Sequence, residues 1–212
     1  METTAGIRVP DSAMCKHATD LVRATESDLL FHHSRRVFFF AALTGSSKKL
    51  KYDVELLYIG AMFHDMGLTP KCATKTERFE VDGANAAAAF LRQYKIKEED
   101  IDLVWDSIAL HTTPGIPQYK KPVVALVTAG VEMDVLGLGF DNVSEENRVE
   151  IVVAHPRGDD FKNGIIHAFY DGIKEKPDTT FGNVKADVIA KFEPEFKRTN
   201  FCDLIINSAW PS

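Results

Sequence analysis

Residues 54–67 read Val-Glu-Leu-Leu-Tyr-Ile-Gly-Ala-Met-Phe-His-Asp-Met-Gly, an apolar run that closes on a histidine and an aspartate. The run follows Asp53, a residue type that caps helix starts, and it precedes Pro70, which cannot continue a helix. These signals predict a helix that opens at Asp53 and carries His64 and Asp65 at its C-terminal end. Two ionisable residues beside so many apolar ones point to a polar site next to the core.

The rest of the chain continues this helical pattern. Apolar residues at helical spacing and capping signals predict further helices over about 11–24, 28–44, 82–94, 98–110, 121–136, 144–153, 161–174 and 184–196. The β-branched run over 123–127 also fits a buried strand, and the length of the surrounding pattern favours a helix. We therefore expect an all-α fold, a compact helical bundle with additional C-terminal helices.

Length and composition define the class of protein. A chain of 212 residues with 45% hydrophobic residues fits a single domain. We expect a core at about 27–140 and a C-terminal helical extension at about 141–212. The apolar stretches fall short of the ~20 residues that span a bilayer, and the first twenty residues lack the apolar centre of a secretory signal. These features favour a cytoplasmic protein with no membrane partner.

The charge and the cysteine content indicate which binding partners and which kinds of site to expect. The net charge is −6, and the basic residues are dispersed among acidic ones, which disfavours a nucleic-acid partner and favours a small-molecule substrate. Cys15, Cys72 and Cys202 lie far apart, so neither a disulfide framework nor a thiolate zinc site is expected. For the oligomeric state, a homodimer is the commonest form among soluble oligomers.

Four residues of metal-ligating type lie on predicted apolar helix faces: His33, the pair His64 and Asp65, and Asp134. A single buried histidine is usually a hydrogen-bonded core residue. Burying the whole set would cost much free energy without shared partners, and one divalent ion would satisfy the set together.

The neighbours of these residues carry a family resemblance. His33-Ser34-Arg35-Arg36-Val37, followed by Gly60-Ala61-Met62-Phe63-His64-Asp65-Met66-Gly67, resembles the HD-domain superfamily of metal-dependent hydrolases. The resemblance implies an HD-type helical fold in which His33, His64, Asp65 and Asp134 bind one metal ion. It implies zinc as that ion, and iron, manganese, cobalt and nickel accept similar ligands.

Three further segments, 79–84, 108–112 and 130–137, are similar to the cyanamide hydratase-like group of that superfamily. This similarity implies an HD-type hydro-lyase that adds metal-activated water to a small nitrile-like substrate, with cyanamide giving urea. Two-metal HD phosphohydrolases have a histidine four residues before a Gly-Ala pair, where this chain has Phe79. One metal ion is therefore expected rather than two.

The same reasoning assigns roles around the ion. Asp65 is a candidate catalytic residue as well as a ligand, because its second oxygen can orient water. His111 is a candidate for proton transfer or substrate binding, since imidazole is acid or base near neutral pH, and a helix C-cap is its alternative role. Thr69 and Thr112 are candidate substrate-binding residues.

Two other functions fit the sequence. One is an HD phosphohydrolase acting on a nucleotide or another phosphate ester, and the other is a catalytically inert, metal-binding regulatory HD protein. Arg35 and Arg36 suit phosphate binding, although a helix-surface role with pairing to Glu26 or Asp28 is favoured. Similarly, Glu80 or Asp82 is expected to cap the helix that follows them.

Overall fold

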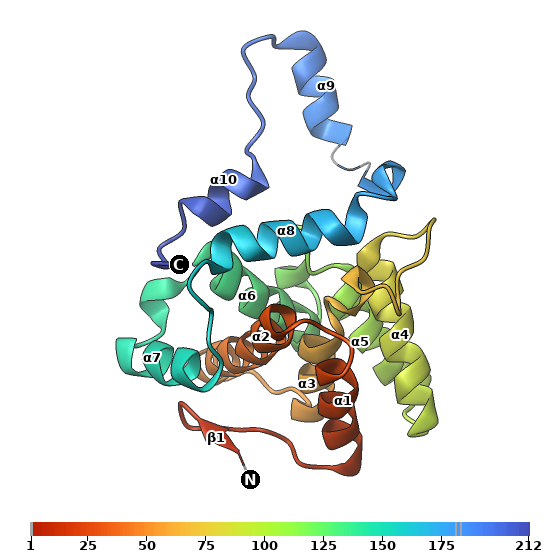
Figure 1. Cartoon of the computed structure of the whole chain (residues 1–212), viewed down its shortest axis with the longest axis vertical. Helices are drawn as coiled ribbons and strands as arrows, with labels where there is room; N and C mark the ends of the chain where they lie inside the picture. Colours follow the sequence, from red (N-terminus) through yellow and green to blue (C-terminus); the bar gives the residue numbers. More distant parts are fainter. Residues whose placement is uncertain (1, 181, 183) are drawn as a thin grey trace.

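The computed structural model describes residues 2–180, 182 and 184–212, and within them nearly all regular structure is helical (Figure 1). The helices are α1 (Ala13–Arg23), α2 (Asp28–Ser47), α3 (Val54–Phe63), α4 (Phe79–Gln93), α5 (Glu98–Ala109), α6 (Pro122–Leu136), α7 (Glu145–Ala154), α8 (Phe161–Ile173), α9 (Val184–Phe192) and α10 (Phe201–Ile206). The only sheet in this part of the chain is a hairpin of β1 (Thr3–Thr4) and β2 (Ile7–Arg8), paired antiparallel. The predicted all-α fold is confirmed.

Short polar side chains set where several helices begin. The Ser27 hydroxyl accepts a hydrogen bond from the Leu30 amide at the start of α2, and the Asp53 carboxylate accepts two amide bonds at the start of α3. The first helix differs slightly from prediction, because Ser12 rather than Asp11 caps α1. Pro122 occupies the first turn of α6, where its missing N–H costs nothing, and the segment is helical rather than extended.

Helices α2 and α6 form the centre of the molecule and run antiparallel. A Cβ atom at Gly130 of α6 would lie 2.3 Å from the carbonyl oxygen of Val37 in α2, so the two backbones meet at this point. Their buried faces consist largely of aromatic and branched aliphatic residues, among them the three consecutive rings Phe38, Phe39 and Phe40. Helices α3 and α5 pack beside this pair, and α4 packs against α5 and α3 (Figure 1).

Helix α4 begins earlier than predicted. It starts at Phe79, and no side chain caps its first amides. The predicted cap is therefore wrong, because both acidic candidates have other partners. The Asp82 carboxylate accepts hydrogen bonds from the Thr74 amide and the Lys176 ammonium group, and Glu80 accepts one from Arg78.

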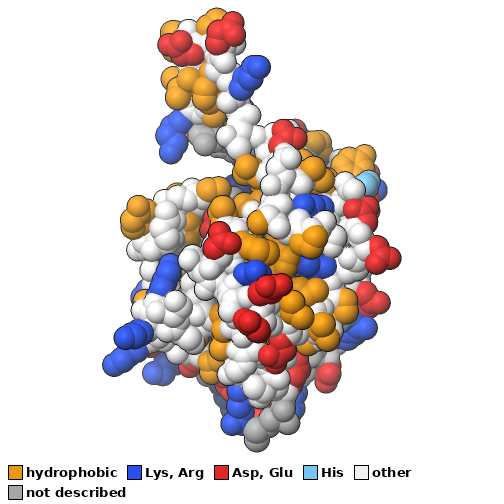
Figure 2. Space-filling model, turned by 90° about the vertical axis from the view of Figure 1, so that its left-hand side faces the viewer, with side chains coloured by type: hydrophobic (Ala, Val, Ile, Leu, Met, Phe, Trp, Pro, Cys, Tyr) orange, Lys and Arg blue, Asp and Glu red, His pale blue; other side chains and the backbone are white. Residues whose placement is uncertain are grey.

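The C-terminal helices differ in whether they pack against the centre of the molecule. Helix α8 lies across it and buries Phe161 and Ile165, whereas α9 projects away from the body, as Figures 1 and 2 show. Phe192 of α9 is 72% exposed, and hydrophobic side chains of this helix lie on the surface. The short helix α10 has no counterpart in the prediction. None of the helices in residues 2–180, 182 and 184–212 combines the length and apolar character needed to cross a membrane.

Candidate metal centre

Helices α2 and α3 bring His33, His64 and Asp65 together in the interior. Helix α3 ends at Phe63, so the next two residues leave its C-terminal end and enter the short 3-10 turn Met66–Leu68. The Nε2 atoms of His33 and His64 lie 3.1 Å apart, and Asp65 Oδ2 lies 3.6 Å from the first and 3.3 Å from the second. All three side chains are at most 1% exposed.

Hydrogen bonds on the far side of each ring show where its proton lies. His64 Nδ1 lies 2.7 Å from the Ala61 carbonyl oxygen, and His33 Nδ1 lies 2.7 Å from Asp134 Oδ2. Both oxygens only accept, so each Nδ1 carries the donated hydrogen, and each neutral ring then presents a lone pair at Nε2. Two lone pairs facing each other at 3.1 Å repel unless a cation or a proton lies between them.

His111 completes the group from the end of α5. Its Nδ1 donates to the Ile108 carbonyl oxygen at 2.6 Å, and its Nε2 lies 3.7 Å from Asp65 Oδ1 without a hydrogen-bond partner. Both Asp65 oxygens are also buried without a hydrogen-bond partner. Three imidazole nitrogens and one carboxylate thus lie close together, and no protein group donates a hydrogen bond to the carboxylate.

This arrangement fits a divalent metal ion. A tetrahedron of ligands about 2.1 Å from its centre has edges of about 3.4 Å, close to the separations among His33, His64 and Asp65. Imidazole and carboxylate groups are the donors that zinc and its first-row neighbours accept. Within the part of the chain that the structure describes, these three residues form the one cluster with this geometry.

Burial and charge set the protonation states in the protein without metal. Burial favours the uncharged form of His64, but the neighbouring Asp65 carboxylate outweighs this and raises the histidine pKa. Burial would likewise raise the pKa of Asp65, and the charge of His64, whose Nε2 lies 3.3 Å from Asp65 Oδ2, holds it below its ordinary value. Burial, followed by the positive charge on His64, lowers the pKa of His111, which leaves its Nε2 lone pair free at neutral pH.

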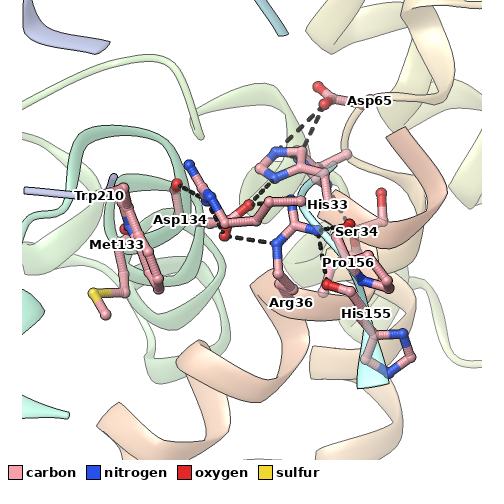
Figure 3. Close-up of polar contacts among 12 residues, drawn as sticks. His33, Ser34, Arg36, Asp65, Met133, Asp134, His155, Pro156 and Trp210 are labelled. Atoms are coloured by element: carbon pink, nitrogen blue, oxygen red, sulfur yellow. Dashed lines mark hydrogen bonds and ion pairs between the residues drawn. The ribbon is translucent and has the colours of Figure 1, made fainter. Parts of the chain in front are cut away.

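Asp134 lies behind His33 rather than inside the cluster (Figure 3). Its carboxylate accepts bonds from Arg36 Nε and Nη2 at 2.8 and 2.9 Å, and from Arg157 Nη1 at 2.8 Å. Together with the bond from His33 Nδ1, these contacts occupy both oxygens. Figure 3 shows Asp65 and Asp134 on opposite sides of His33.

These contacts give Asp134 a role behind His33 in the protein without metal. Two buried guanidinium groups need a carboxylate, and they lower the pKa of Asp134 although burial acts to raise it. A carboxylate that holds the far nitrogen of a ligating histidine fixes the ring and its tautomer. Direct ligation by Asp134 stays a prediction, and its contacts in the structure favour a supporting role.

The two threonines have separate positions. Thr69 is buried and donates its hydroxyl to the Met66 carbonyl oxygen at 2.6 Å, so its hydroxyl closes the turn after Asp65. Thr112 follows His111 and donates to the Glu80 carboxylate. Neither hydroxyl contacts the cluster in the structure, and their roles in substrate binding stay predictions.

The expected helix-surface role of the two arginines is wrong. Arg36 is fully buried on Asp134, with further bonds from its Nη1 to the carbonyl oxygens of His155 and Pro156. Arg35 is also buried, and it donates to the Tyr58 hydroxyl and to the Glu2 carboxylate. Neither arginine pairs with Glu26 or Asp28. The partners of both arginines are distant in the sequence, so the spacing of residues along one helix could not predict these pairs.

Two residues near the centre have contacts that sequence reasoning did not predict. Arg157, in the loop between α7 and α8, donates to Asp134 and thereby connects the C-terminal helices to the metal centre. Glu26 is buried just before α2, where Ser34 donates to it at 3.3 Å. Burial, and then the charge of Asp65, raises the pKa of Glu26 well above its ordinary value. No sequence motif marks either residue.

Comparison with known proteins agrees with this geometry. The family model described as HD domain matches residues 30–154, more than half of the chain, and this range includes His33, His64, Asp65 and Asp134. A search of curated proteins gave no match. HD domains bind divalent metal ions, and members of the family are generally metal-dependent hydrolases. By this match and by its buried His-His-Asp cluster, the chain belongs to the HD-domain family.

Proposed function

We propose that this protein is a metal-dependent hydratase that adds water to a small nitrile-like substrate, and that cyanamide, which would give urea, is the first substrate to test. The convergence of the His33, His64, Asp65 and His111 donor atoms in a buried site carries the proposal. His33, His64 and Asp65 would hold one ion, for which zinc is the first candidate. When bound, such an ion polarises the substrate and lowers the pKa of water toward neutrality.

The side chains around the ion would have separate roles in the reaction. Asp134 keeps the hydrogen of His33 on Nδ1, so that Nε2 stays available for ligation. Asp65 has two unpaired oxygens, one for ligation and one that can accept a hydrogen bond from the reacting water. Cyanamide becomes urea when both hydrogens of one water molecule end on the nitrile nitrogen. His111 Nε2 can take a proton from the oxygen and return it to the nitrogen.

The charges near the cluster favour hydration over phosphate-ester hydrolysis. A phosphohydrolase site needs cationic groups free to contact phosphate. The buried guanidinium groups of Arg36 and Arg157 are paired with the Asp134 carboxylate. Phe79 stands where two-metal relatives have a histidine, and its ring packs against His111 with centroids 5.6 Å apart. These residues support a single-ion centre.

Metal content and product formation can be measured on one preparation. We expect about one equivalent of metal per chain by elemental analysis, with urea formed from cyanamide. His167→Ala removes an exposed histidine of α8 and serves as the matched control for His64→Ala, which should lose both metal and activity. Phosphate release from nucleotides, especially with two metal ions, would replace this proposal with the phosphohydrolase function. Bound metal without either product would favour the regulatory one.

A further inference from the structure

A cavity of about 490 Å³ opens on the side of the molecule next to His111. It lies between the start of α4, the loop after α5, the end of α8 and the start of α10. Its walls are mainly apolar and include Phe79, Phe169, Ile173 and Phe201. A volume of this size falls within the range of pockets that hold drug-sized ligands, far more than cyanamide alone would fill.

A continuous series of rings joins this cavity to the metal centre. The His64 and His111 rings have centroids 5.0 Å apart, and Phe79 packs edge-on against His111 at 5.6 Å. Phe79 then contacts Phe169 at 5.4 Å, and Phe169 contacts Phe201 at 5.9 Å. Because Phe79 both lines the cavity and touches His111, one aromatic ring separates the cavity from the cluster.

The polar groups of the cavity indicate the charge of its ligand. Glu80 accepts hydrogen bonds from Arg78 at 3.0 Å and from the Thr112 hydroxyl, so the only acidic and basic side chains in the lining neutralise each other. No unpaired cation remains among the described lining residues to bind a phosphate group. The chemistry of the walls suits an uncharged, flat, apolar group that stacks against phenylalanine rings.

We infer that this cavity binds an apolar substituent of aromatic size on the substrate, whose reacting nitrile then lies toward His111. The inference rests on the proposed hydratase function and extends it from cyanamide itself to substituted cyanamides and nitriles. Thr112 lines the cavity and directly follows His111 in the chain, so it is placed to contact the polar end of such a substrate. The aromatic residues of α4, α8 and α10 would then determine specificity.

Binding of phenylurea and of urea to the metal-loaded protein, measured by calorimetry, tests this without turnover. Both are products of hydration, and they differ only in the phenyl group. We expect phenylurea to bind at least about tenfold more tightly than urea. Phe169→Trp adds bulk inside the cavity and should remove most of this difference. Tyr170→Trp is the matched control, because Tyr170 is the neighbouring residue of α8, is 59% exposed and does not line the cavity.

A second variant covers the case in which Phe169→Trp disturbs folding. Phe201 is 44% exposed at the rim, so Phe201→Ala should fold normally and weaken phenylurea binding severalfold. Equal binding of phenylurea and urea, or phenylurea binding that neither cavity variant changes, would overturn the inference. Phenylurea binding that the cavity variants weaken, in a protein that hydrates no cyanamide or nitrile, would instead retain the pocket and reject the hydratase function.

Discussion

The substitution Asp134→Asn separates the two roles that sequence and structure give to this residue. In the structure four hydrogen bonds from His33, Arg36 and Arg157 end on the Asp134 carboxylate, and all of these groups are almost completely buried. Asparagine removes the charge and replaces one accepting oxygen with an NH₂ donor. Two guanidinium groups then remain in the interior without a counter-ion.

The expected loss of stability follows from that burial. Removing one partner of a buried ion pair typically costs about 3–5 kcal/mol, because the other charge stays buried and unpaired. For a chain of this size, about 3–5 kcal/mol corresponds to a fall of roughly 6–20 °C in Tm. Loss of the support behind His33 should also weaken metal binding by about 10- to 100-fold while leaving one site per chain.

Chemical unfolding of the metal-free protein, followed by circular dichroism, measures the first effect, and titration against a chromophoric chelator measures the second. Asp65→Asn provides the contrast, because both Asp65 oxygens lack a hydrogen-bond partner. It should abolish metal binding, and it should cost the metal-free protein less stability than Asp134→Asn, because the charged neighbours of Asp65 are histidines rather than two buried guanidinium groups. Asp141→Asn, an exposed change close to α6, should alter neither quantity. An Asp134→Asn protein of normal stability that binds no metal would show that Asp134 is a ligand.

Three further results are expected. Metal binding should release more than half a proton per ion at pH 6.5, because the pKa of His64 is raised above its ordinary value of 6.5 and the ion displaces that proton; calorimetry in buffers of different ionisation enthalpy measures this. His111→Ala should keep the metal but lower kcat for hydration by roughly 10²- to 10⁴-fold, the usual contribution of a proton-transfer group, and unchanged kinetics would return His111 to its capping role. The hydrogen bond from His155, and then the charge of Arg35, lower the pKa of Glu2 from 4.5 to about 2. The stabilisation from Glu2 should therefore be present above pH 4.5 and lost as the pH falls toward 2, so the Tm difference between wild type and Glu2→Gln should disappear over that interval.

Features that depend on residues close together in the chain could be predicted from the sequence. Apolar periodicity located α2, α3 and α6, and Asp53 was recognisable as the cap of α3. The His64-Asp65 pair was recognisable because it ends an apolar helix and lies in a family motif. The pairing of Arg35 with Glu2 was not predictable, since the two residues are 33 positions apart and no periodic pattern connects them.

The position of Asp134 shows how part of the site can still be derived from helix packing. Glycine at position 130 allows α6 to touch the α2 backbone at Val37, which a Cβ atom would prevent. Because the helices are antiparallel, one turn forward from Gly130 reaches Asp134, and one turn back from Val37 reaches His33. The 2.7 Å bond between Asp134 and His33 is therefore a consequence of this helix crossing. Helix packing does not distinguish ligation from support. The contact that favours support comes from Arg157, whose loop lies beyond the predicted core and brings a second positive charge to the same carboxylate.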